Sequence, residues 1–269
     1  MPDHALGAYM SNDTSRKPTI RTVAIVLAAV IAAGTPIIQA LTGTLSVGQS
    51  DLVTSGDATL RAAAYAFSIW GLIYGALLAF AVYQALPATQ ESPSLRRLGW
   101  PSVVAMLGCS AWLVATTYDA RLATVAIIVV SAAVLCVPLA RRYPVQHRID
   151  FWLICAPVSM LAGWLTVASA INTLTVLTGF GVIDAVSAPA WAAAGVALVA
   201  IIGLWLTSVS RNWVYPLPIA WGLVAVGVAE QADRPLVALM AVISAVGLVG
   251  MAIWVSTHRS LLLPLPRQQ

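Results

Sequence analysis

Aromatic and neutral polar residues at helical spacing are the residues of this sequence best suited to chemistry. Trp164, Ala168 and Asn172 follow one another at intervals of four, which on a helix places them in one slowly drifting stripe. Trp70 and Tyr74 have the same spacing in an earlier apolar stretch. Large aromatic rings with a few orienting polar groups are the usual lining of a small-molecule site, so these residues predict an aromatic pocket.

A third apolar stretch adds Trp112 to this candidate set. Helix packing is the competing interpretation, because neutral polar groups join membrane helices at about 0.6 kcal/mol per hydrogen bond and tryptophan is common at membrane interfaces. The amide of Asn172 has no partner in lipid. We therefore expect its stripe to face other helices.

Ionisable residues suited to catalysis are missing from the apolar stretches. The acids Asp119, Asp150, Asp184, Glu230 and Asp233 fall at stretch ends, and His4, His147 and His258 fall in tails or loops. Glu230 is the nearest candidate for a buried acid, but we interpret it as an interfacial helix end beside Asp233. No catalytic set and no metal-binding motif can be assembled, which favours a binding protein over an enzyme.

The three cysteines also give no sign of a metal site or a disulfide framework. Cys109, Cys136 and Cys155 lie inside apolar stretches and lack a CxxC spacing. We interpret them as small apolar residues of helix interiors.

The composition identifies the elements that must hold these residues. The chain is 60% hydrophobic and 9% charged, whereas soluble domains are about 25% charged. It is therefore an integral membrane protein, and we expect its helices to contact the lipid bilayer. The net charge of +4 is explained by cations at helix ends and does not indicate a nucleic-acid partner.

Uncharged stretches of about 20 residues are long enough to cross the hydrocarbon core. The sequence has eight candidates, which predict an all-α, polytopic helical bundle with about eight transmembrane helices. They are Thr22–Leu41, Ala62–Leu86, Leu98–Tyr118, Leu122–Ala140, Phe151–Phe180, Ala188–Ser208, Trp213–Ala229 and Pro235–Thr257. The seventh is the least secure, because Pro216 and Pro218 interrupt its start.

The basic residues predict the orientation of these spans. With eight spans, eleven Lys and Arg residues fall on the side of the N-terminus, and only Arg61, Arg121 and Arg234 fall on the other. Cytoplasmic loops collect such cations, so we expect both termini in the cytoplasm of a bacterial inner membrane. The first span also imitates a signal peptide, but its length favours a retained helix. The polar loop over residues 42–61 is either an external lid or a plain connector.

Two of these stretches resemble signatures of the TspO/MBR family, the tryptophan-rich sensory or translocator proteins. "WGLIY" at residues 70–74 resembles the Trp-x-x-x-Tyr of the family's second helix, and "WLTVASAIN" at 164–172 is similar to its fifth-helix pattern. Trp112 fits the third-helix tryptophan. The family's Trp-Pro-Pro approach to the second helix is replaced by "TLRAAAYAFSIW", Ser68 stands where a proline is common, and Cys109 replaces an asparagine.

The resemblance implies a five-helix core over residues 20–183, followed by three additional transmembrane helices over 184–258. Residues 1–19 and 259–269 would be cytoplasmic tails. This would be an enlarged relative of the five-helix family.

The family implies a membrane receptor or sensor for a flat hydrophobic small molecule, such as a tetrapyrrole or a sterol. The residues carried over as ligand-binding are Trp70, Tyr74, Trp112, Trp164, Ala168 and Asn172. No cofactor is required, and porphyrin or haem is expected only as a ligand, without axial histidine ligation.

Three alternatives stay open beside the receptor. The additional helices could complete the path of a permease, with Pro216 and Pro218 marking a broken helix near the substrate. The protein could degrade porphyrins, or it could be a structural partner in a membrane complex. The sequence also leaves open whether the protein is a homodimer.

Overall fold

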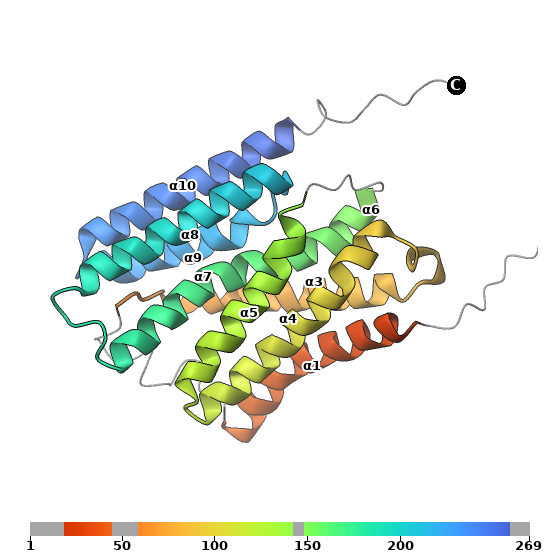
Figure 1. Ribbon diagram of the computed structural model, residues 1–269, viewed down its shortest axis with the longest axis horizontal. Helices are drawn as coiled ribbons and strands as arrows, with labels where there is room; N and C mark the ends of the chain where they lie inside the picture. Colours follow the sequence, from red (N-terminus) through yellow and green to blue (C-terminus); the bar gives the residue numbers. More distant parts are fainter. Residues whose placement is uncertain (1–18, 45–58, 142–147, 259–269) are drawn as a thin grey trace, which may run out of the picture.

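The computed structural model describes residues 19–44, 59–141 and 148–258, which fold into helices joined by short turns (Figure 1). Within these ranges there are eight long helices and no strand. The long helices are α1 (Ile20–Thr42), α3 (Ile69–Gln84), α4 (Pro93–Thr117), α5 (Arg121–Leu139), α7 (Ala156–Gly179), α8 (Ala188–Ser210), α9 (Pro216–Glu230) and α10 (Pro235–Thr257). The short elements are the 3-10 turns η1 (Ala64–Ser68) and η2 (Pro87–Thr89), the helical turn α6 (Arg148–Asp150) and the π-helical turn η3 (Phe151–Cys155).

The predicted all-α membrane bundle is confirmed. Seven helical segments of the described chain are long and apolar enough to cross a membrane, counting η1 with α3 and counting α6 and η3 with α7. The eighth, α9, has 15 residues and is about 22 Å long, short of a hydrocarbon core of about 30 Å. Pro216 and Pro218 both lie in its first turn, where a missing N–H breaks no helical hydrogen bond. They begin a helix and do not interrupt one.

The chain enters α9 through a short irregular stretch in which the Asn212 side chain makes two hydrogen bonds. Asn212 donates from Nδ2 to Ser159 Oγ at 2.5 Å, and its Oδ1 accepts from the backbone N–H of Val214 at 3.1 Å. Irregular backbone at membrane depth persists only where such partners exist. Asn212 thus stabilises the irregular backbone between the end of α8 and the start of α9.

The long helices form two groups that share α7 (Figure 1). In the first group α1 contacts α3 and α4, and α7 contacts α3 and α5, while α4 and α5 pack together, which closes a ring of five helices. The second group, α8, α9 and α10, packs against α7 mainly through α9 and α8. Successive long helices run in opposite directions, so α1 begins at the end of the bundle where α10 ends (Figure 1).

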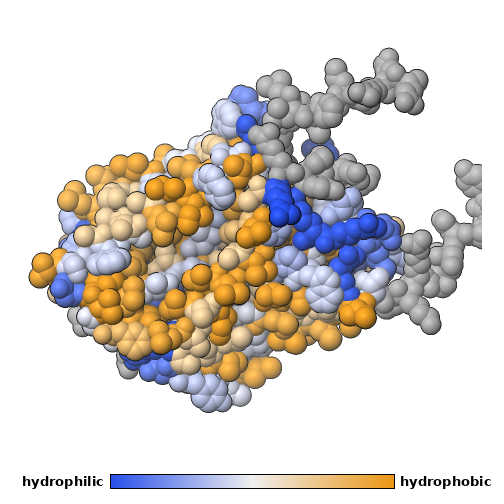
Figure 2. All heavy atoms as spheres, in the orientation of Figure 1, coloured by the Kyte–Doolittle hydropathy of each residue, from blue (hydrophilic) through white to orange (hydrophobic). Residues whose placement is uncertain are grey.

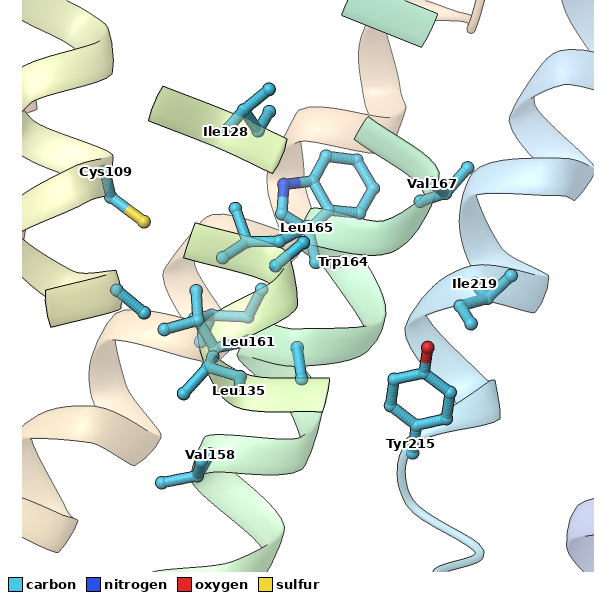
Figure 3. Close-up of a cluster of buried hydrophobic side chains, with 14 of the residues drawn as sticks. Cys109, Ile128, Leu135, Val158, Leu161, Trp164, Leu165, Val167, Tyr215 and Ile219 are labelled. Atoms are coloured by element: carbon cyan, nitrogen blue, oxygen red, sulfur yellow. The ribbon is translucent and has the colours of Figure 1, made fainter. Parts of the chain in front are cut away.

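Glycines allow the close approach of α7 and α9. A Cβ at Gly163 would lie 2.2 Å from the backbone oxygen of Tyr215, and one at Gly222 would lie 2.9 Å from Val167. The fully buried Tyr215 hydroxyl is 2.9 Å from Thr166 Oγ1. Figure 3 shows Tyr215 on one side of α7, with Cys109 and Ile128 of α4 and α5 on the other.

The surface divides into an apolar flank and a polar end. Hydrophobic residues cover most of the flank, and hydrophilic residues gather at the end where α4 begins (Figure 2). The described arginines at that end are Arg21, Arg96, Arg97, Arg141, Arg148 and Arg211, against Arg61, Arg121 and Arg234 at the other. The predicted tails, and residues 45–58 of the predicted lid, lie outside the described part of the chain.

Candidate functional site

Helix α3 presents two of the predicted aromatic residues as a stacked pair. Trp70 is the second residue of α3 and Tyr74 lies one turn further on. Their rings stack with centroids 5.0 Å apart and planes 20° apart, as expected for side chains four residues apart on one helix face. Both side chains are half-buried, so this face of α3 meets neighbouring helices and is not open to lipid along its whole width.

Trp164 of α7 contacts this pair from the neighbouring helix. Its ring makes an edge contact with Trp70, with centroids 6.1 Å apart and planes 81° apart. A second edge contact reaches Phe67, at 6.2 Å and 78°. Trp164 is buried, with 3% of its surface exposed. We call Phe67, Trp70, Tyr74 and Trp164 the aromatic cluster.

Phe67 was not among the predicted site residues. It lies three positions before Trp70, a spacing that brings two side chains to the same side of a helix. The sequence therefore carried a signal for it. That signal is ambiguous, because Phe67 belongs to the 3-10 turn η1, whose three residues per turn change the direction of every side chain.

The rest of the α7 stripe continues from Trp164 towards the end of that helix. Ala168 and Asn172 are half-buried, and Asn172 Nδ2 donates to Thr124 Oγ1 of α5 at 3.2 Å. The stripe thus faces other helices and satisfies its amide there, as its pattern predicted. Ala168 and Asn172 lie one and two turns beyond Trp164 on α7.

Trp112 of α4 is not in ring contact with the cluster among the described residues. It is half-buried, and its Nε1 is shielded from solvent without a hydrogen-bond partner in the described part of the chain. Cys109, one turn earlier on the same helix, is buried. Helix α4 therefore carries a buried thiol and a shielded indole N–H on neighbouring turns.

A surface depression lies apart from this cluster. It is found where α4 turns into α5, near the end of α7, and includes none of the predicted site residues. Its lining residues are Asp119, Ala120, Arg121, Leu122, Ala123 and Phe180. It contains a surface ion pair between Arg121 and Asp119, whose Nε and Oδ1 are 2.9 Å apart.

Glu230 differs from its predicted environment. It ends α9, as expected, but its side chain is completely buried. The backbone N–H and the Nε of Arg61 donate to Glu230 Oε1 at 2.9 and 3.3 Å. Arg234 Nη1 lies 3.4 Å from Glu230 Oε2, within ion-pair distance but without hydrogen-bond geometry. Glu230 was expected to lie at an interfacial helix end in contact with water. It is buried because Arg61 and Arg234 take the place of the water that its carboxylate loses.

The neighbouring Asp233 completes an ion-pair network with these residues. Arg61 Nη2 donates to Asp233 Oδ2 at 2.5 Å, and this hydrogen bond lowers the pKa of Asp233. The same hydrogen bond raises the pKa of Arg61. We call Arg61, Glu230, Asp233 and Arg234 the ion-pair network. Each of the four lies within ion-pair distance of an oppositely charged member, so the network ties the segment before α3 to the end of α9.

Metal chemistry finds no support in the described residues. Among them, no group of three or more His, Cys, Asp or Glu side chains could hold a metal ion. The arrangement that remains is a set of aromatic rings from η1, α3 and α7, with the Asn172 amide two turns further along α7.

One comparison with known proteins found a match. A family profile described as TSPO-like protein matches residues 23–254, from the first turns of α1 to the end of α10. The match includes α8, α9 and α10 as well as the first five long helices. None of the curated proteins or solved structures matches the chain. Because the profile covers most of the chain, this protein belongs to the TSPO-like protein family.

Proposed function

We propose that this protein is a membrane receptor or sensor that binds a flat, hydrophobic ligand, of which a tetrapyrrole is the best candidate, against the aromatic cluster. The observation that carries the proposal is the contact of Trp70 and Tyr74 with Trp164 across two helices. Flat ring systems stack on indoles and bury a large apolar area, and each aromatic pair adds about 0.5–1.5 kcal/mol beyond that burial.

Polar groups around the cluster support the same ligand class. The buried, unpaired Nε1 of Trp112 is a donor without an acceptor, and the Asn172 amide lies two turns from Trp164. One or two such groups fix the orientation of an otherwise apolar ligand. A porphyrin carries carboxylates and ring nitrogens that could pair with them. The described long helices contain no histidine, so a porphyrin between them would be held by stacking and not by axial ligation.

Protoporphyrin IX binding in detergent micelles tests the proposal. Titration should give a saturable shift of the porphyrin absorption, and the Trp70→Phe and Trp164→Phe variants should bind about five- to tenfold more weakly, since about 1 kcal/mol of stacking is removed. Trp205→Phe is the matched control, because Trp205 lies on α8 and is 55% exposed. Equal affinities for all four proteins would remove the aromatic cluster from the site.

Transport is a separate question from binding. A permease would accumulate ligand inside proteoliposomes, whereas a receptor binds it without accumulation. The pair Pro216 and Pro218, which suggested a broken helix, is explained by the start of α9. The receptor is therefore the simpler proposal, and proteoliposome uptake of protoporphyrin measured beside the binding assay would overturn it.

A further inference from the structure

The segment that leads into α3 is bound to the C-terminal helices. The backbone N–H of Ala63 donates to the carbonyl of Ala225 in α9 at 3.0 Å. The indole Nε1 of Trp221, also in α9, donates to the carbonyl of Ala66 at 3.0 Å. Tyr65 makes an edge contact with the Trp221 ring, with centroids 5.4 Å apart. Three consecutive contacts thus join residues 63–66 to one face of α9.

The ion-pair network fixes the same segment one step earlier in the chain. Arg61 donates to Glu230 through both its backbone and its side chain, and Arg234 donates to the backbone carbonyl of Thr59. Glu230 is fully buried, where charge interactions are screened less than at the surface. The backbone from Thr59 to Ala66 is therefore held at both of its ends.

This anchored segment is continuous with the aromatic cluster. Ala66 is fully buried and lies next to Phe67, which touches Trp164, and four positions before Trp70. The 3-10 turn η1 joins the anchor to α3 without an intervening loop. A displacement of Ala66 would therefore move Phe67 directly and rotate the first turn of α3, where Trp70 stands.

We infer that α9 and the turn that follows it position the aromatic face of α3, with Glu230 and Trp221 as positioning residues that tune ligand affinity without touching the ligand. This inference rests on the proposed function for its ligand and assigns a role to the C-terminal helices.

Two variants test this role with little change of shape. Glu230→Gln keeps the volume and an acceptor for the Arg61 N–H but removes the charge, and Trp221→Phe removes the donor to Ala66 while keeping an aromatic ring. Asp184→Asn is the matched control, because Asp184 is an exposed acid that caps Ser187 elsewhere in the chain. If Glu230→Gln does not fold, Trp221→Phe alone decides the result.

The first measurement needs no ligand. In protein labelled with 5-fluorotryptophan, the ¹⁹F resonances of Trp70 and Trp164 are assigned from the Trp70→Phe and Trp164→Phe variants. Both resonances should shift or broaden in Glu230→Gln and Trp221→Phe, while the resonance of Trp100, exposed on α4 at the opposite end of the bundle, stays in place. Unchanged Trp70 and Trp164 resonances in both folded variants would overturn the inference.

The second measurement is the affinity for protoporphyrin IX. The two variants should bind about fivefold or more weakly than wild type, with Asp184→Asn unchanged. If the resonances shift but the affinity for protoporphyrin IX is unchanged, Glu230 and Trp221 do not tune ligand affinity. Failure of the wild-type protein to bind protoporphyrin contradicts the proposed function, and the ¹⁹F result then decides the positioning role by itself.

Discussion

Replacement of Gly163 by alanine should separate α7 from α9. The added Cβ would lie 2.2 Å from the carbonyl oxygen of Tyr215, 3.3 Å from its carbonyl carbon and 3.4 Å from Pro218 Cδ. The first of these is backbone, which cannot rotate away as a side chain can. One helix must therefore shift by about 1 Å to restore an ordinary contact distance.

The expected loss of stability follows from what that shift disrupts. Overpacking in a close-packed interior costs about 1–3 kcal/mol, and the backbone obstacle places Gly163→Ala at the upper end. The shift would also stretch the bond between Thr166 Oγ1 and the Tyr215 hydroxyl, now 2.9 Å, which adds about 0.6 kcal/mol. The gain in helix propensity from glycine to alanine, about 0.5–1 kcal/mol, opposes this. A net loss of about 3 kcal/mol is the result.

Reversible denaturation in mixed detergent micelles measures this difference. Gly250→Ala in α10 is the matched control, because nothing lies within 4 Å of its added Cβ, so only the propensity gain should remain. Gly163→Ala should be destabilised while Gly250→Ala is unchanged or slightly more stable. Equal stabilities for the two variants would refute the close approach of α7 and α9.

Three further predictions concern the two ends of the bundle. Asp150→Ala should lower the free energy of unfolding by about 2 kcal/mol, because the hydroxyls of Tyr83 and Ser92, each 2.7 Å from a carboxylate oxygen, lose their acceptor; Asp150→Asn should lose less, and equal losses would contradict this reason. Arg61 keeps the pKa of Asp233 below its ordinary value of 3.8, so the stability from this pair is complete above about pH 4 and is lost as the pH falls through the lowered pKa. The stability difference between wild type and Asp233→Asn should therefore shrink in acid, and a constant difference down to pH 2 would count against the pair. A green fluorescent protein fused to the C-terminus should fluoresce in bacterial cells, because the arginine-rich end of the bundle is expected in the cytoplasm; a dark fusion with an active alkaline phosphatase counterpart would reverse the orientation.

The sequence predicted the helices well because bilayer thickness determines their length. The eight predicted spans correspond to the eight long helices, and even the doubtful seventh exists, beginning at Pro216. Its shortness was visible in the sequence. The hydrogen bond that holds the irregular approach to α9 could not be predicted, because Asn212 and its partner Ser159 are 53 positions apart.

The candidate site was predictable only where its residues share one helix. The stacking of Trp70 on Tyr74 follows from their spacing, whereas the contact of Trp70 with Trp164 depends on how two helices pack. The burial of Glu230 was missed for the same reason, since its partner Arg61 is 169 positions away. Trp112 makes no ring contact with the cluster among the described residues, where α3 and α4 flank α1 on opposite sides.

The sharing of α7 by both helix groups has a consequence for shortened forms of this protein. Its candidate span is the most buried one in the described chain, and the surface that it turns to α9 carries Gly163 and the hydroxyl of Thr166. A fragment ending near residue 183 would expose this surface to lipid. Acyl chains would pack poorly at Gly163 and could not hydrogen-bond to the Thr166 hydroxyl. The first five long helices are thus not built to stand alone, and a truncated chain should aggregate or recruit a second copy to cover α7.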